Sequence, residues 1–111
     1  LKNGLKLTSG SDCPVAPCNP MIGIYAAVTR KAESGQVLAP DEAISSEDAL
    51  QMYTLAGAYA SFEEKVKGSI EVGKLADIVI LSTDPTNIAP EKIKDIKIEK
   101  TIVGGKVAWE R

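Results

Sequence analysis

The chain has 111 residues, of which 44% are hydrophobic and 25% are charged, and its formal net charge is -2. This length allows one small domain with a modest core, and the balanced composition excludes a disordered tail. The basic residues form no cationic stripe and no apolar run approaches the ~20 residues that span a bilayer, so we expect a cytoplasmic protein that binds neither nucleic acid nor membrane.

The first predicted element is a short strand over residues 5–7, which leads into a loop rich in glycine and proline. Asp12 lies in this loop, just past the carboxyl end of the predicted strand. Open α/β sheets and barrels place active groups at such positions, because their strand ends converge there. An aspartate at this position can also be a simple turn former that bonds the backbone two residues on. The local pattern leaves both interpretations open.

Two cysteines, Cys13 and Cys18, share the loop with Asp12. Four residues separate them, which is not the spacing of a common zinc knuckle, and two thiols are too few for a metal site. In a cytosolic chain such cysteines are most often unpaired, buried and apolar in behaviour. The chain contains no histidine, so Asp12 has no imidazole partner here.

A first helix is predicted over residues 20–33. Asn19 is a good N-cap and Pro20 suits the first helical position, while Gly35 is the expected stop. The apolar residues then recur with helical spacing at Met21, Ile24, Tyr25 and Val28. We therefore expect this stripe to pack against the rest of the domain.

A second helix is predicted to begin after Ser45, which stands at capping-box spacing from Asp48. Its apolar stripe runs over about four turns through Ala49, Met52, Tyr53, Ala56 and Ala60. Gly57 within the stripe indicates either close packing at that point or a helix that ends early.

From residue 68 the sequence changes from helical to strand-like patterns. Residues 75–81 are rich in β-branched side chains and predict a largely buried strand. A helical turn over 90–95 then precedes two strands at 96–103 and 106–109, which Gly104 and Gly105 join as a hairpin. We expect Trp109 to be packing surface. The change near 68–73 suggests pieces of two different domains.

Several motifs in chain order resemble those of metal-dependent amidohydrolases. The closest similarity is to the amidohydrolase 3 branch, which includes the N-substituted formamide deformylases and the YtcJ-like proteins. The motifs are Gly10-Ser11-Asp12-Cys13-Pro14-Val15, Asn19 to Arg30, Tyr53-Thr54 with Ala58-Tyr59-Ala60, and Gly68-Ser69-Ile70-Glu71-Val72-Gly73-Lys74-Leu75-Ala76-Asp77.

The resemblance implies that this chain is a C-terminal fragment, a quarter or less of a longer enzyme, as its start at Leu1 without a methionine also suggests. The implied fold class is an α/β fragment. Residues 1–67 would hold the last strand of a (β/α)8 barrel, the metal-site loop and two helices. Residues 68–111 would be strands of a small β-sandwich beside the barrel.

The same resemblance implies a role for Asp12 as metal ligand and catalytic base. The matching aspartate of the family binds a divalent ion, expected to be zinc, and takes a proton from the attacking water. The other ligands, chiefly histidines, would precede residue 1. The implied activity is hydrolysis of a non-peptide C–N bond in a small amide, formamide or cyclic amide, with the isolated chain metal-free, inactive and prone to self-association.

An alternative is a self-standing structural or interaction module of helices and a β-hairpin. Its exposed apolar faces would then serve for association with partners. A cooperative melt of a well-folded 11.7 kDa monomer or dimer would favour this alternative. A third interpretation, a metal-storing cysteine protein, requires zinc at Cys13 and Cys18.

Overall fold

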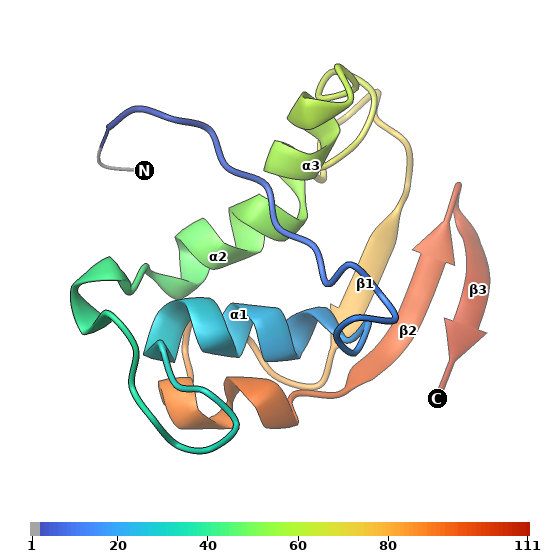
Figure 1. Cartoon of the computed structure of the whole chain (residues 1–111). Helices are drawn as coiled ribbons and strands as arrows, with labels where there is room; N and C mark the ends of the chain where they lie inside the picture. Colours follow the sequence, from blue (N-terminus) through green and yellow to red (C-terminus); the bar gives the residue numbers. More distant parts are fainter. Residues whose placement is uncertain (1–2) are drawn as a thin grey trace.

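The computed structural model describes residues 3–111 as a set of helices beside a three-stranded antiparallel sheet (Figure 1). The helical part contains α1 (Pro20–Thr29), η1 (Pro40–Glu42, a 3₁₀ turn), α2 (Ser46–Tyr53) and α3 (Leu55–Ala60). The later part contains β1 (Ile78–Leu81), η2 (Pro90–Asp95, also 3₁₀), β2 (Ile98–Val103) and β3 (Lys106–Glu110). The predicted α/β character is confirmed, and the assignment to a barrel and a sandwich stays a prediction.

The predicted strand over residues 5–7 does not form. This segment runs as extended chain past α2, with Thr8 Oγ1 and Ser9 N both donating to the Met52 carbonyl at 3.2 and 3.1 Å (Figure 1). A strand needs a neighbouring strand to complete its hydrogen-bond ladder. Within the described residues, β1, β2 and β3 pair only with one another, so the prediction is wrong for this chain.

Helix α1 begins as predicted and ends early. Asn19 caps it, since its Oδ1 accepts a hydrogen bond from the N–H of Met21 at 3.0 Å. The helix ends at residue 29 in place of 33, because Arg30 adopts a left-handed φ of 55° and donates its N–H to the Ala26 carbonyl. Non-glycine residues rarely adopt this conformation, so the local sequence does not predict that the helix ends at Arg30. Gly35, the expected stop, lies in the turn beyond.

The region of the second predicted helix forms two separate helices, α2 and α3. The predicted cap at its start is confirmed, because Asp48 N donates to Ser45 Oγ at 3.0 Å. The Asp48 carboxylate accepts from the same hydroxyl, whereas in a capping box it would accept from the backbone N–H of Ser45. Thr54, with φ -126° and ψ -95°, then separates α2 from α3. The break redirects the apolar face, so that Ala58 is buried while Ala60, a member of the predicted stripe, is exposed.

Gly57 neither ends the helix nor serves close packing. Helix α3 continues through it, and a Cβ at this position would meet only Thr8 Oγ1, at an ordinary 3.6 Å. We therefore expect Gly57→Ala to raise the free energy of unfolding by about 1 kcal/mol, because alanine has the higher helix propensity. Urea denaturation of the 111-residue chain measures this gain.

The matched control for that substitution is Gly23→Ala in α1. There a Cβ would lie 2.8 Å from Tyr53 Cζ, which packs against the core. We expect the second variant to lose stability, because the tyrosine ring must shift. Loss of stability in Gly57→Ala would contradict the geometry given for α3.

The predicted hairpin is confirmed and the predicted burial of the first strand is not. Gly104 and Gly105, both with positive φ (56° and 79°), join β2 to β3 in the two-residue turn that such angles favour. In β1, Val79 and Ile80 are 52% and 45% exposed, and Trp109 of β3 is 48% exposed. Within residues 3–111, the sheet lacks a second layer that would bury these side chains.

The core joins the two halves of the chain. It consists of five buried side chains, those of Met21, Ile24, Ala49, Ile93 and Ile96. Tyr25, Val28 and Tyr53 pack around it, which confirms the predicted helix stripes at these positions. Because α1 and η2 meet in this core, the chain before residue 68 packs directly on the chain after it. The division into 1–67 and 68–111 stays a prediction.

Within the described residues, the helices are too short or too polar to cross a membrane.

Candidate functional site

Asp12 lies in an exposed loop between the extended N-terminal segment and α1. Its φ is 51°, in the left-handed region that aspartate tolerates better than most residues. Its carbonyl accepts a hydrogen bond from the N–H of Val15 at 2.8 Å. Main-chain atoms therefore close the turn, and the side chain of Asp12 is exposed. Its carboxylate is in a position to contact a ligand.

The loop exposes three groups that could contact a metal ion, the Asp12 carboxylate and two thiols. Cys13 and Cys18 are unpaired, as predicted, but both are exposed, because the loop lies outside the core. In residues 3–111, no three histidine, cysteine, aspartate or glutamate side chains come together to hold a metal ion. A carboxylate oxygen suits a divalent cation. Asp12 thus fits as one ligand of a set, and the chain described here supplies no complete set.

Residues 68–77 form a hydrogen-bonded turn. The Lys74 side chain is 11% exposed and its Nζ donates to Ser69 Oγ and to Glu71 Oε1, the latter at 3.1 Å. The Ser69 hydroxyl in turn donates to the same Glu71 oxygen. These contacts hold the pKa of Glu71 below its usual value, chiefly through Ser69 and next through Lys74. Glu71 and Lys74 therefore satisfy each other, with Ser69 between them.

Two other residues fix the same turn to its surroundings. The Asp77 carboxylate accepts a hydrogen bond from the N–H of Gly104 at 2.8 Å, which ties the motif to the hairpin turn. Gly68 packs so closely on α3 that a Cβ there would lie 2.7 Å from the Ala58 Cβ. The motif therefore has a structural role in this chain, linking α3 to the sheet.

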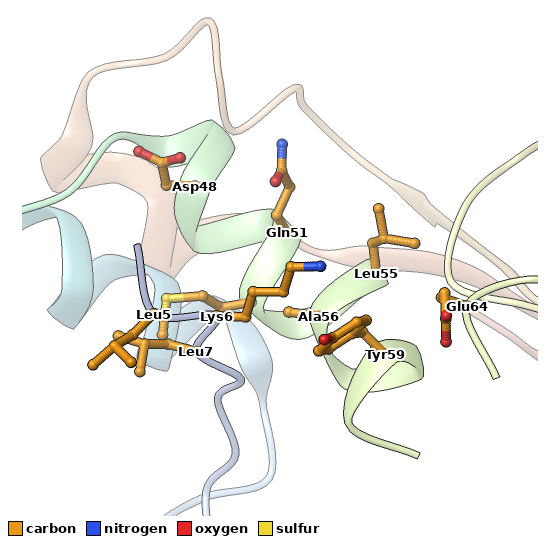
Figure 2. Close-up of a pocket in the computed structure, with 10 residues that line it drawn as sticks. Leu5, Lys6, Leu7, Asp48, Gln51, Leu55, Ala56, Tyr59 and Glu64 are labelled. Atoms are coloured by element: carbon orange, nitrogen blue, oxygen red, sulfur yellow. The ribbon is translucent and has the colours of Figure 1, made fainter. Parts of the chain in front are cut away.

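A groove of about 260 Å³ lies between the N-terminal segment and the helices α2 and α3 (Figure 2). Its lining consists of Leu5, Lys6, Leu7, Asp48, Gln51, Met52, Leu55, Ala56, Tyr59 and Glu64. The Lys6 ammonium lies 3.8 Å from the centroid of the Tyr59 ring, a cation–π contact. Asp12 is not among the lining residues, so the predicted site and this groove are separate.

The groove contains a residue that the sequence analysis did not single out. Glu64 Oε2 is buried, and among the described residues it has no hydrogen-bond partner. Two adjacent glutamates followed by a lysine are typical of a solvated surface. The fold places Glu64 at the groove that the N-terminal segment forms with α2 and α3, and it buries one oxygen of this carboxylate.

Comparisons with known proteins agree along almost the whole chain. A family model described as "Amidohydrolase family" matches residues 1–109. The chain is 35% identical over 111 residues to the N-substituted formamide deformylase of Arthrobacter pascens. It is 32% identical over 114 residues to the protein YtcJ of Bacillus subtilis. Its structure resembles that of an amidohydrolase from Thermotoga maritima MSB8, with a TM-score of 0.73 and 25% identity over 99% of this chain.

These relatives are much longer than the chain. The two sequence alignments include 100% of the chain but 20% of the deformylase and 22% of YtcJ, and the structural match covers 24% of the Thermotoga protein. The chain therefore spans between a fifth and a quarter of the length of the proteins it matches.

Proposed function

The chain belongs to the amidohydrolase family, and from that membership we propose that it is the C-terminal part of a metal-dependent hydrolase acting on non-peptide C–N bonds. The proposed substrate is a small amide, formamide or cyclic amide. The observation that carries the proposal is the family match over residues 1–109, within which an exposed acid occupies the loop before α1. The formamide class is supported by the name of the deformylase relative.

Asp12 has two roles in this proposal, metal ligand and general base. A bound divalent cation, zinc in our proposal, would lower the pKa of a water ligand to about 7 and would polarise a substrate carbonyl. The Asp12 carboxylate accepts the proton that the attacking water gives up, and it then donates that proton to the leaving nitrogen. The turn from Asp12 to Val15 holds the main chain at this residue while the carboxylate acts.

We propose that the 111-residue chain does not catalyse the reaction by itself. Catalytic zinc sites have about three protein ligands, and in this proposal Asp12 is the ligand that the chain contributes. The remaining ligands, chiefly histidines, belong to the part of the enzyme before residue 1. Exposed apolar side chains on the sheet, at Val79, Val103 and Val107, also favour self-association of the isolated chain.

In this proposal, the two parts of the chain belong to different domains of the parent enzyme. Residues 1–67 would complete the catalytic barrel with its last strand, the loop of Asp12 and the helices, and residues 68–111 would complete a β-sandwich. Residues 5–7 form neither helix nor strand in this structure. They would gain strand hydrogen bonds once neighbouring barrel strands flank them.

Metal removal tests the proposed function. We expect the full-length enzyme to hydrolyse an N-substituted formamide, to lose essentially all turnover after chelation, and to recover it when zinc is added back. The 111-residue chain, assayed in parallel with zinc, should release no amine. Turnover that persists after exhaustive chelation would contradict the proposal, as would an upstream reading frame without a His-x-His motif.

A further inference from the structure

A second groove lies where η2, β2 and the end of β3 meet near the start of α1 (Figure 1). Its volume is about 360 Å³, within the roughly 300–1,000 Å³ typical of small-molecule pockets. The charged residues that line it are all basic, namely Lys94, Lys97 and Arg111. The chain as a whole is slightly acidic, with a net charge of -2. The groove therefore gathers positive charge on one concave part of an acidic chain, which attracts anions.

The positive charges of this groove are not neutralised within the described residues. Lys94 and Lys97 form no ion pair there. The Lys94 ammonium lies 5.5 Å from the centroid of the Tyr25 ring, a contact that leaves its charge in place. Arg111 Nη1 lies 3.6 Å from Glu99 Oε1, but both side chains are open to water, at 56% and 42% exposure. Such an exposed pair is weak, so an anion can compete for the guanidinium.

The groove also has an aromatic and aliphatic surface. Trp109 of β3 lines it and is about half exposed. Ile96, which belongs to the buried core, and Ile98 of β2 line it as well. An indole face offers a large flat area on which another ring can stack. Positive charge beside an aromatic face suits a ligand that has both an anionic group and a ring.

Main-chain hydrogen bonds hold the backbone that carries two of the cations. Lys97 donates its N–H to Ser82 Oγ at 3.0 Å and accepts from the N–H of Ser82 at 2.9 Å. The N–H of Arg111 donates to the Glu99 carbonyl at 3.1 Å. Because the backbone is already in place, ligand binding has to order only side chains, which lowers its entropic cost.

We propose that this groove binds a small organic anion in which a phosphate or carboxylate group is joined to a flat apolar ring. Lys94, Lys97 and Arg111 would pair with the anionic group, and guanidinium suits the geometry of both phosphate and carboxylate. The ring would lie against Trp109. This binding requires neither Asp12 nor a metal ion, because Asp12 does not line the groove. It is therefore independent of the proposed hydrolysis.

Trp109 is itself the reporter for the test, because it is the only tryptophan in the 111-residue chain. We expect phenyl phosphate to change its fluorescence saturably, with a Kd that rises with salt as the charges are screened. Inorganic phosphate offers the anion alone and benzyl alcohol the ring alone, so each should bind at least about tenfold more weakly. Benzoate, titrated in parallel, shows whether carboxylate or phosphate is the preferred anionic group.

The variant that tests the charges is Lys97→Gln, with Lys92→Gln as its matched control. Lys92 is an exposed lysine of η2 that does not line the groove. Lys97→Gln should raise the Kd for phenyl phosphate about tenfold, the loss expected when a hydrogen bond between charged groups is removed. Lys92→Gln should leave the Kd unchanged. Neither substitution should shift the urea midpoint, because both side chains are exposed and the Lys97 hydrogen bonds are made by its main chain.

Equal affinity for phenyl phosphate and inorganic phosphate would show an adventitious ion only and would overturn the proposal. Equal effects of Lys97→Gln and Lys92→Gln would overturn it too. Calorimetry of the full-length holoenzyme should show the same dependence on Lys97, and this difference between the variants excludes phosphate bound at the metal. Binding by the 111-residue chain that is absent from the full-length enzyme would mean that the rest of the enzyme covers the groove, which would also contradict the proposal.

The outcome can be separated from that of the proposed function. Metal-dependent turnover by an enzyme whose groove binds no phenyl phosphate would count against the anion site alone. Binding that depends on Lys97 in a protein without metal-dependent turnover would count against the proposed function alone.

Discussion

Asp12→Asn is expected to lower kcat of the full-length enzyme by about 10²–10⁴-fold, the range that a positioned general base contributes. The amide keeps the shape of the carboxylate but cannot take up the proton, and it is a poorer ligand for a divalent cation. Because Asp12 is exposed and its turn is closed by main-chain atoms, we expect the fold to be unchanged. Steady-state kinetics with circular dichroism of the same samples measure both effects.

The matched control for this variant is Asp41→Asn. Asp41 is an exposed acid in η1 and has no role in the proposed mechanism. We expect it to leave kcat unchanged. Metal analysis separates the two roles of Asp12. If the variant retains its zinc and its kcat stays low, the substitution has removed the base. If excess zinc restores kcat, the substitution has removed only a metal ligand. A near-normal rate in Asp12→Asn without added zinc would refute both roles.

The second large effect is expected at Gly68, which contacts α3. Gly68 and Gly73 both have a φ of +94°, so a side chain strains the backbone equally at the two positions. At Gly73 a Cβ would meet nothing within 4 Å, whereas at Gly68 it would lie 2.7 Å from the Ala58 Cβ and 3.1 Å from the Leu55 Cα. We expect Gly73→Ala to cost about 1–2 kcal/mol of unfolding free energy. Gly68→Ala should cost about 1–3 kcal/mol more, because α3 must move.

Urea denaturation of the three proteins with a common m-value measures this difference. Because both glycines belong to one turn and share one φ, subtracting the two costs isolates the steric part at α3. Equal costs would show that α3 shifts without penalty, contrary to the close packing of Gly68 on Ala58. In the full-length enzyme we expect Gly68→Ala to reduce the yield of folded protein without changing kcat of the folded fraction.

The sequence predicted those features whose cause is local. The Asn19 cap, the Ser45 cap and the two-glycine turn at Gly104 each depend on a few neighbouring residues, and the structure has all three. The family resemblance was likewise readable from ordered motifs, and the comparisons confirm it over residues 1–109. The role of Asp12 follows from that resemblance and stays a prediction.

Other features depended on contacts between distant parts of the chain, and these the sequence did not predict correctly. Arg30 and Thr54 interrupt helices at residues that carry no breaking signal. The apolar pattern of residues 5–7 predicted a strand, and that of β1 predicted a buried one. Periodicity shows which side chains would favour a packing partner, but it does not show whether that partner is present.

By itself, the sequence determined the caps and the turns, because each is encoded in residues close together along the chain, and it determined the family and the candidate base through motifs that are legible without any contact between them. Only the tertiary structure showed that Gly68 lies against α3 and that Glu64, outwardly a surface acid, has an oxygen buried beside an apolar groove. The physical reason is that crowding and desolvation are set by atoms distant in sequence. A glutamate's need for a partner becomes visible only once folding has removed its water.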